Sequence, residues 1–225
     1  MKTFIYQHLE MGDNIICNGL IREFCKENPQ DNHFLATKHL NSESVRFMYR
    51  DLKNLELVLI NGTCEIPIVL DQNPYDKFIK VGHGLINLYK HFDEGFYEQH
   101  GIDMKKRWSS FKVERDSERE NNFYNKFEIS SDYAFVHEDA SRNMIVTKNI
   151  NPNLRIIKAE RSLTNNIFDY LKLIENAKEI HCIPSSFLFL CDSFDFKGDR
   201  FLHKYSRRYP HHGAPTLRLE WNEID

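Results

Sequence analysis

The sequence predicts an α/β protein with two parallel sheets in series. Short apolar segments alternate with segments of helical periodicity, and this alternation occurs twice, once before residue 92 and once after residue 133. A polar, aromatic stretch at 92–128 separates the two series and contains no long Pro- or Gly-rich linker. Strand–helix–strand–helix order favours a parallel sheet with helices on its faces.

The first series contains three strands and two helices that the apolar spacing predicts clearly. Strands are expected at 3–8, 33–37 and 55–60, and helices at 14–27 and 42–52. The segment 65–70, EIPIVL, is interpreted as a fourth strand or as the continuation of a hairpin. The segment 76–82, DKFIKVG, is a further strand candidate.

The middle stretch is expected to be mostly helical and to contain the domain junction. We place an N-terminal domain at 1–110, a helical connector at 111–132 and a C-terminal domain at 133–225. In the C-terminal domain, strands are expected at 133–137, 154–159 and 179–183, with closing strands at 199–205 and 216–221. An amphipathic helix is expected at 165–177, and a short apolar helix begins at a pair of serines at 185 and 186.

The composition excludes several classes of protein. The net charge of -3 over 225 residues gives no global attraction to nucleic acid, although KYSRRYPHH is a local basic stretch. No apolar run approaches the roughly 18 to 20 residues of a membrane span, and the N-terminus does not look like a secretory signal. The five cysteines contain no C-x-x-C pair, which is typical of reduced thiols in a cytoplasmic protein. We expect no disulfide, no metal site and no cofactor.

The first candidate site follows the first strand. In open α/β sheets, ligands bind beyond the carboxyl ends of the strands. Gly12 and Asp13 lie at such a junction, with Asn14 and Asn18 close by. Gly12 could let a substrate approach the backbone, and Asp13 could deprotonate a hydroxyl group. The alternative is structural, because an aspartate at this position could simply cap the following helix.

A second candidate site is the segment VHEDASRN at 136–143, which follows the first strand of the second series. It gathers His137, Asp139, Ser141 and Arg142 at a strand end. Arg142 could clamp a phosphate. The alternative is a surface turn with an exposed arginine.

The third candidate site is CIPSSFLFL at 182–190. Ser185 and Ser186 open a helix after a buried strand, so free N–H groups and two hydroxyls could bind an anion there. The alternative is an ordinary serine cap. His83, in the loop GHG at 82–84, is a weaker candidate for a residue that lines the site.

Four segments together resemble a known group of enzymes. They are HLEMGDNIICNGLIRE, FYEQHGI with the following RW and FKVERD, YAFVHEDASR, and AKEIHCIPSSFLFLCDSF. The combination resembles glycosyltransferases from surface-polysaccharide gene clusters of bacteria and their viruses. That group looks like a distant, compact branch of the heptosyltransferase-like enzymes of GT-B architecture. The resemblance covers roughly residues 3 to 210.

The resemblance implies two Rossmann-like domains that face a cleft. The N-terminal domain would take the acceptor, and the C-terminal domain would take a nucleotide-sugar donor without a metal ion. Gly12 and Asp13 match the Gly-Asp in which the acid is the proposed general base. Pro184-Ser185-Ser186 stands where heptosyltransferases have Asp-Thr-Gly, and His137-Glu138-Asp139 replaces their His-Pro-Gly.

The function implied is transfer of a sugar to a glycan or lipid-linked acceptor in surface polysaccharide synthesis. It is carried by Asp13 as base and by His137, Arg142, Ser185 and Ser186 as donor-binding residues. Two alternatives remain open: a non-catalytic nucleotide- or glycan-binding protein on the same fold, and a structural protein that assembles through its aromatic surface. Peripheral contact with a membrane is a possible partner interaction of such a transferase, and no nucleic acid partner is expected.

Overall fold

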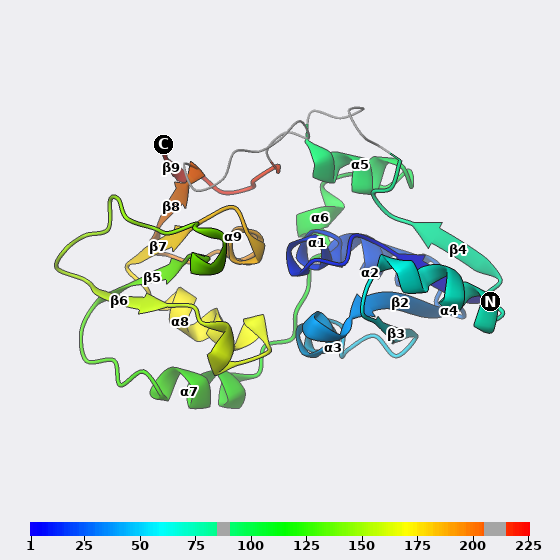
Figure 1. Cartoon of the computed structure of the whole chain (residues 1–225), viewed down its shortest axis with the longest axis horizontal. Helices are drawn as coiled ribbons and strands as arrows, with labels where there is room; N and C mark the ends of the chain where they lie inside the picture. The colour runs from blue at the N-terminus through cyan, green and yellow to red at the C-terminus, as the bar shows by residue number, and fades with distance from the viewer. Residues whose placement is uncertain (85–90, 205–214) are drawn as a thin grey trace. The chain divides into compact units, whose positions relative to one another are not determined.

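A computed structural model describes residues 1–84, 91–204 and 215–225, and the chain divides into two compact units (Figure 1). Unit 1 comprises Met1–Glu114 and a short stretch of chain that ends at Thr216. Unit 2 begins at Arg115 and also contains the end of the chain, Leu217–Asp225. The change of unit after Glu114 falls within the connector expected at 111–132. Most of the basic stretch KYSRRYPHH lies outside the described residues.

Unit 1 is a four-stranded sheet in which every strand pair is parallel. Its strands are β1 (Lys2–Tyr6), β2 (Asn32–Lys38), β3 (Leu55–Ile60) and β4 (Lys77–Lys80), in the order β3-β2-β1-β4. Its helices are α1 (Met11–Ile16), α2 (Asn18–Glu27), α3 (Ser42–Met48), α4 (Ile66–Gln72), α5 (Phe92–Glu98) and α6 (Lys106–Ser109), with 3₁₀ turns η1 (His39–Asn41) and η2 (Thr63–Glu65). β1 lies between β2 and β4, and Phe4, Ile5 and Leu35 of these strands are fully buried.

Two expectations for this unit need correction. The helix expected at 14–27 is two helices, because α1 ends and α2 begins at Cys17. The segment 65–70 is helix α4 with Pro67 in its first turn, not a strand. Its apolar residues Ile66, Val69 and Leu70 have i, i+3, i+4 spacing and pack on one cluster with Phe4. A short apolar run does not distinguish the two periods, and proline suits the first turn of a helix better than a strand interior.

A close backbone contact joins α2 to α6. A Cβ atom on Gly19 would lie 2.1 Å from the carbonyl oxygen of Lys106, so only glycine fits there. The next residue, Arg107, forms a buried ion pair with Asp93 of α5. The Asp93 carboxylate also accepts hydrogen bonds from the backbone N–H of Thr216, at 3.1 Å. This carboxylate therefore anchors the returning chain to unit 1.

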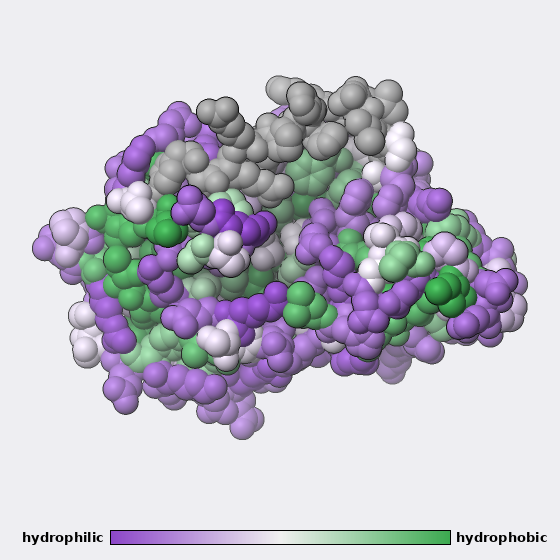
Figure 2. Space-filling view, in the orientation of Figure 1, coloured by the Kyte–Doolittle hydropathy of each residue, from purple (hydrophilic) through white to green (hydrophobic). Residues whose placement is uncertain are grey.

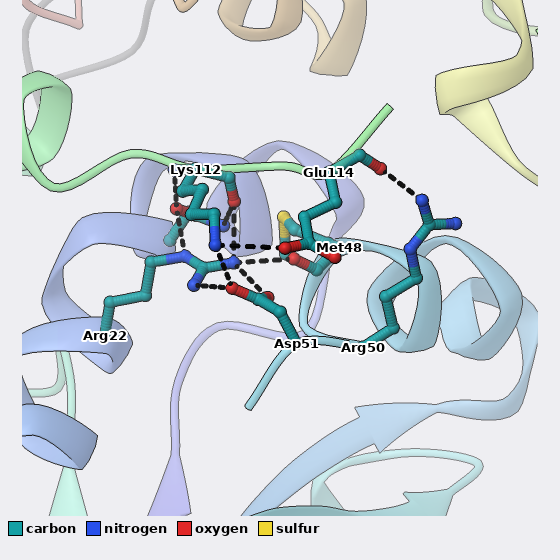
Figure 3. A network of polar contacts seen from close by, with 7 residues as sticks. Arg22, Met48, Arg50, Asp51, Lys112 and Glu114 are labelled. Carbon is teal, nitrogen blue, oxygen red and sulfur yellow. Dashed lines mark hydrogen bonds and ion pairs between the residues drawn. The ribbon is translucent and has the colours of Figure 1, made fainter. Parts of the chain in front are cut away.

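A second polar network fixes the last residues of unit 1 before the chain leaves it (Figure 3). The Arg22 guanidinium donates to both carboxylate oxygens of Asp51 and to the carbonyl oxygens of Met48 and Lys112. Burial alone would raise the pKa of Asp51, but the hydrogen bonds from Arg22 and Lys112 hold that pKa at about 2. Because the network binds the backbone at Lys112, it fixes the chain's exit from unit 1.

Unit 2 is a five-stranded sheet, again with every strand pair parallel. Its strands are β5 (Tyr133–His137), β6 (Arg155–Lys158), β7 (Glu179–Cys182), β8 (Asp199–His203) and β9 (Asn222–Ile224), in the order β6-β5-β7-β8-β9. Its helices are α7 (Ser117–Asn125), α8 (Leu171–Glu175) and α9 (Ser186–Asp192), with 3₁₀ turns η3 (Ala140–Arg142), η4 (Arg161–Leu163) and η5 (Ile167–Tyr170).

Two expectations for unit 2 also change. The helix expected at 165–177 is the 3₁₀ turn η5 followed by the short helix α8. The segment 216–221 is not a strand, because the buried Asp192 carboxylate takes the N–H groups of Arg218 and Leu219 at 3.0 Å. Those donors are therefore not available to a neighbouring strand, and pairing begins only at Asn222.

The two faces of the second sheet are covered differently. On one face Phe135 packs against Tyr170 and Phe187, which come from η5 and α9. On the other face, the connection 138–154 has no α-helix and lays Met144 and Val146 on Ala134 and Val136. Figure 2 shows hydrophobic side chains gathered around β6 and the segment before it. Among the described helices, none is long and apolar enough to span a membrane.

A chain of buried polar groups crosses this second face. Nδ1 of His181 lies 2.9 Å from Nε2 of His203, and Nε2 of His181 lies 3.0 Å from the Glu179 carboxylate. An ionised carboxylate only accepts, so His181 donates a hydrogen bond to Glu179 through Nε2. Its Nδ1 atom then accepts a hydrogen bond from the Nε2–H group of His203. Both rings are fully buried and neutral; burial, with help from His181 and Lys148, lowers the pKa of His203 to about 4.

We predict that Gly19→Ala destabilises unit 1 by about 1–3 kcal/mol, because the new methyl group must push the backbone of α6 away from α2. Gly62→Ala is the matched control, since a Cβ atom there meets only the Cys64 sulfur at 4.0 Å. Chemical denaturation of both variants measures the difference. Equal stability of the two variants would show that α6 does not need this close approach.

We predict that unit 2 loses stability as the pH falls from 6.5 towards 4. The unfolded chain binds a proton on His203 near pH 6.5, whereas the folded chain resists protonation until about pH 4. The free energy of unfolding should therefore fall by up to about 3 kcal/mol over this range. Hydrogen exchange of the β7 and β8 amides measures it. His203→Gln should give a flatter pH dependence, and an unchanged slope would contradict the assignment.

Candidate functional site

The carboxyl ends of parallel strands meet at one edge of each sheet, and the predicted site residues follow those ends. In unit 1, His8 and Asp13 come after β1, Lys38 ends β2, and His83 comes after β4. In unit 2, His137 ends β5 and Ser185 follows β7. Each unit therefore gathers polar side chains at the edge where open α/β sheets bind ligands.

Asp13 lies within the first turn of α1, so the capping interpretation was wrong. The N-cap residue is Glu10, and its side chain makes no capping hydrogen bond. Gly12 is also inside this helix and has ordinary helical backbone, not the open conformation that its glycine suggested. Asp13 is half-buried, and its negative charge is favourable at a helix N-terminus. Burial raises the pKa of the Cys17 thiol, and the nearby Asp13 carboxylate raises it further.

The two asparagines expected beside Asp13 serve the interior of unit 1. Asn14 accepts a hydrogen bond from Gln7 at 2.7 Å and donates to the Glu10 carbonyl at 2.8 Å. Asn18 accepts from the Lys112 N–H at 3.0 Å and from Arg22 at 3.2 Å. Both side chains are fully buried, so neither presents a polar group to a ligand in this structure.

His83 lies in a stack of aromatic rings. Its ring centroid is 4.4 Å from that of Tyr6 and 4.6 Å from that of His8, with interplanar angles of 22° and 13°. Burial above all, and then electrostatic repulsion from the neighbouring His8 and Lys80, lowers the pKa of His83, so the His83 ring is neutral at pH 7. Both of its faces are covered, and its Nε2 atom is buried without a hydrogen bond. His83 therefore packs against Tyr6 and His8 at the carboxyl edge of the first sheet.

In unit 2 the structure brings two predicted residues into direct contact. The Ser185 hydroxyl lies 2.9 Å from Nδ1 of His137, and the His137 ring stacks on Phe187 at 4.4 Å. Ser185 is the N-cap residue of α9, but its side chain makes no capping hydrogen bond; Ser186 is the first residue of the helix. Burial lowers the pKa of His137 to about 4, outweighing the opposing effect of Asp139. His137 is therefore neutral at pH 7.

The loop after β5 forms a compact polar turn. Asp139 accepts hydrogen bonds from Ser141 at 2.6 Å and from Nε of Arg142 at 2.5 Å. Hydrogen bonding from Ser141 first, and the Arg142 charge with it, lowers the pKa of Asp139. The Arg142 side chain is 56% exposed, which leaves much of its guanidinium open to solvent. Such a group can pair with a phosphate in two-point geometry.

One residue of these edges was missed by sequence reasoning. His8 is only two residues beyond β1, stacks on His83, and its Nε2 atom lies 3.2 Å from the Gly82 carbonyl oxygen. The signal was present, because His8 and the GHG loop both follow strands of the same sheet. Neighbouring strands β1 and β4 are far apart in sequence, so only the strand order reveals that the two histidines meet.

No protein-family model matches this sequence, and a search of curated proteins finds no match. Solved structures do match. A glycosyl transferase family 9 structure from Veillonella parvula aligns over 100% of this chain and 88% of its own, with a TM-score of 0.57 and 10% identity. The Escherichia coli ADP-heptose LPS heptosyltransferase II aligns over 100% of this chain and 90% of its own, with a TM-score of 0.60 and 9% identity.

A third similar structure is TibC from enterotoxigenic Escherichia coli, described as an iron-containing dodecameric glycosyltransferase. It aligns over 97% of this chain and 63% of its own, with a TM-score of 0.53 and 8% identity. At such low identity the likeness concerns the fold. The predicted fold class is confirmed: the chain has two parallel α/β units and the GT-B-like fold of these glycosyltransferases.

Proposed function

We propose that this protein is a glycosyltransferase that moves a sugar from a nucleotide-sugar donor to a hydroxyl group of a glycan or lipid-linked acceptor. The observation that carries the proposal is the full-length likeness to glycosyltransferase structures, in a chain whose two sheets both gather polar side chains at their carboxyl edges. Its setting would be the synthesis of surface polysaccharide in the cytoplasm, at or near a membrane surface.

The donor would bind the carboxyl edge of unit 2. Arg142 offers an exposed guanidinium after β5, and Ser185 and Ser186 offer hydroxyls after the neighbouring strand β7. His137 is neutral, so it would act there as a hydrogen-bonding group and not as a fixed charge. As the sugar leaves, negative charge develops on the diphosphate, and donors already in place would stabilise it. We propose that these groups do so without a metal ion.

The acceptor would bind the carboxyl edge of unit 1, with Asp13 as general base. The acceptor oxygen forms the new bond to the anomeric carbon of the sugar, and its proton passes to the Asp13 carboxylate. The bond between that carbon and the diphosphate oxygen breaks, and its electron pair leaves with the nucleoside diphosphate. Because α1 follows β1 directly, its first turn holds this carboxylate at the edge.

A binding protein without catalysis is the second candidate. The observation that favours it is the pairing of Arg142 with Asp139, which already neutralises part of the charge that a diphosphate needs. Thermal shift with a panel of nucleotides and nucleotide sugars tests both candidates for binding, because a ligand at a hundredfold excess over its Kd stabilises by about 2.7 kcal/mol. Slow hydrolysis of a bound nucleotide sugar then supports the enzyme, and binding without turnover supports the alternative.

We predict that Arg142→Ala weakens nucleoside diphosphate binding by about 1.5–3 kcal/mol, the range of a charge-assisted hydrogen bond. The matched control is Arg155→Ala, because Arg155 starts β6 at the opposite edge of the same sheet and its guanidinium donates to the Glu128 carbonyl. Calorimetry should show wild-type affinity in the control. Equal affinity in both variants would remove Arg142 from the donor site.

We predict that Asp13→Asn lowers turnover by roughly 10²–10⁴, because an amide cannot accept the acceptor's proton. Its melting temperature should change little, since a charge at a helix N-terminus contributes only about 0.3–1 kcal/mol. Glu10→Gln makes the same change of charge three residues earlier, at an exposed side chain, and should retain activity. Undiminished hydrolysis of the donor in Asp13→Asn would count against the base assignment.

A further inference from the structure

We propose that His8 is an acceptor-binding residue whose Nδ1 atom accepts a hydrogen bond from a hydroxyl group of the acceptor. The inference rests on the proposed function, and it adds a specific contact that neither the sequence nor the fold alone suggests. It follows from how the imidazole ring is held at the carboxyl edge of unit 1. Three observations carry it: the stack, the glycine beneath the ring, and the tautomer.

The stack covers both faces of the His8 ring. His83 lies against it at 4.6 Å and 13°, and Phe96 of α5 lies against it at 5.5 Å and 18°. Near-parallel rings at these distances are in offset-stacking range. A sugar therefore has no free imidazole face on which to stack. Any ligand contact with His8 must be made in the plane of the ring, at one of its edges.

Gly82 makes room for one side of the imidazole ring of His8. Its φ of +78° lies in the region that favours glycine, and a Cβ atom there would lie 2.3 Å from Phe96 and 2.8 Å from His8. The side-chain oxygen of Gln99, the residue after α5, accepts a hydrogen bond from the Gly82 N–H at 3.2 Å. The Gly82 carbonyl oxygen is 3.2 Å from Nε2 of His8. The loop is thus shaped so that one ring nitrogen meets a backbone acceptor.

That contact fixes the proton on the ring. A carbonyl oxygen can only accept, so Nε2 carries the hydrogen and Nδ1 carries the lone pair of the neutral ring. No hydrogen bond joins Nδ1 to any described residue, and Nδ1 is not among the buried unpartnered atoms. The lone pair of Nδ1 is therefore available at the surface of this edge, on the segment that leads directly into α1.

The chemistry of Nδ1 selects the class of ligand. A lone pair needs a donor, and an ionised phosphate has only acceptors, so the neutral ring suits a hydroxyl group and rejects the diphosphate of the donor. Phe96 of α5 and Gln99, the residue after α5, contribute uncharged groups to this side.

Two variants separate the lone pair from the ring. His8→Phe keeps an aromatic ring in the stack and removes the acceptor atom. His8→Asn removes the ring but keeps an acceptor oxygen near the position of Nδ1. The probes are methyl glycosides of the common hexoses, with a nucleoside diphosphate as the control ligand. Ring nitrogen shifts of His8 are followed by NMR in the full chain, with and without each probe.

We predict the Nε2–H tautomer in wild type and a shift of the Nδ1 signal when a methyl glycoside binds. Binding should fall about tenfold in His8→Phe. In His8→Asn it should persist, because the amide oxygen keeps an acceptor near the position of Nδ1. A nucleoside diphosphate should leave the His8 signals unchanged. A purely structural role for His8 would give none of this dependence on the acceptor atom.

Three results would overturn the inference: the Nδ1–H tautomer, equal sugar binding in wild type and His8→Phe, or no response of His8 to any methyl glycoside. The proposed function fails separately. If no nucleotide sugar binds the protein while His8 still responds to a glycoside, the glycan contact stands and the transferase does not. If nucleotide sugars bind while His8 does not respond, only the role of His8 is wrong.

Discussion

Parallel pairing of every strand in the described parts of the chain is the constraint on which the account depends. It forces each connection to cross over the sheet, and it places the carboxyl ends of neighbouring strands at one edge. Residues far apart in sequence, such as His8 and His83 or His137 and Ser185, meet for that reason. The order of the parallel strands alone therefore gathers polar side chains at one edge of the sheet in each unit.

Buried charges hold the segments that leave and return to these sheets. Asp93 fixes Thr216 to unit 1, Asp192 fixes Arg218 to unit 2, and Arg22 fixes the backbone at Lys112 (Figure 3). Each of these groups is satisfied by partners inside its own unit, which makes it a poor candidate for ligand binding. The Arg142 guanidinium, which pairs with Asp139 but is 56% exposed, and the Nδ1 lone pair of His8 remain open to a ligand.

The sequence predicted strands correctly where apolar runs alternated with segments of clear helical periodicity. It predicted them wrongly at two short apolar runs whose periodicity was ambiguous. The run at 65–70 is helical because its apolar residues match the 3.6 period and Pro67 suits a first turn. The run at 216–221 is not a strand because Asp192 captures its N–H groups, a contact of long sequence separation. Asp13 and Arg142 could be proposed from their junctions in the sequence, whereas the contact of His8 with His83 required the order of strands, and the burial of Asn14 and Asn18 required the packed core.

The most direct test of the central claim is the location of a bound nucleoside diphosphate. Backbone and side-chain NMR signals of the full chain, recorded with and without uridine, guanosine, adenosine and cytidine diphosphates, would map it. We predict that at least one of them perturbs the carboxyl edge of unit 2, at His137, Arg142, Ser185 and Ser186, and leaves the amino end of that sheet at Arg155 unchanged. Binding mapped to another surface, or no binding by any of the four, would contradict a donor site at this edge.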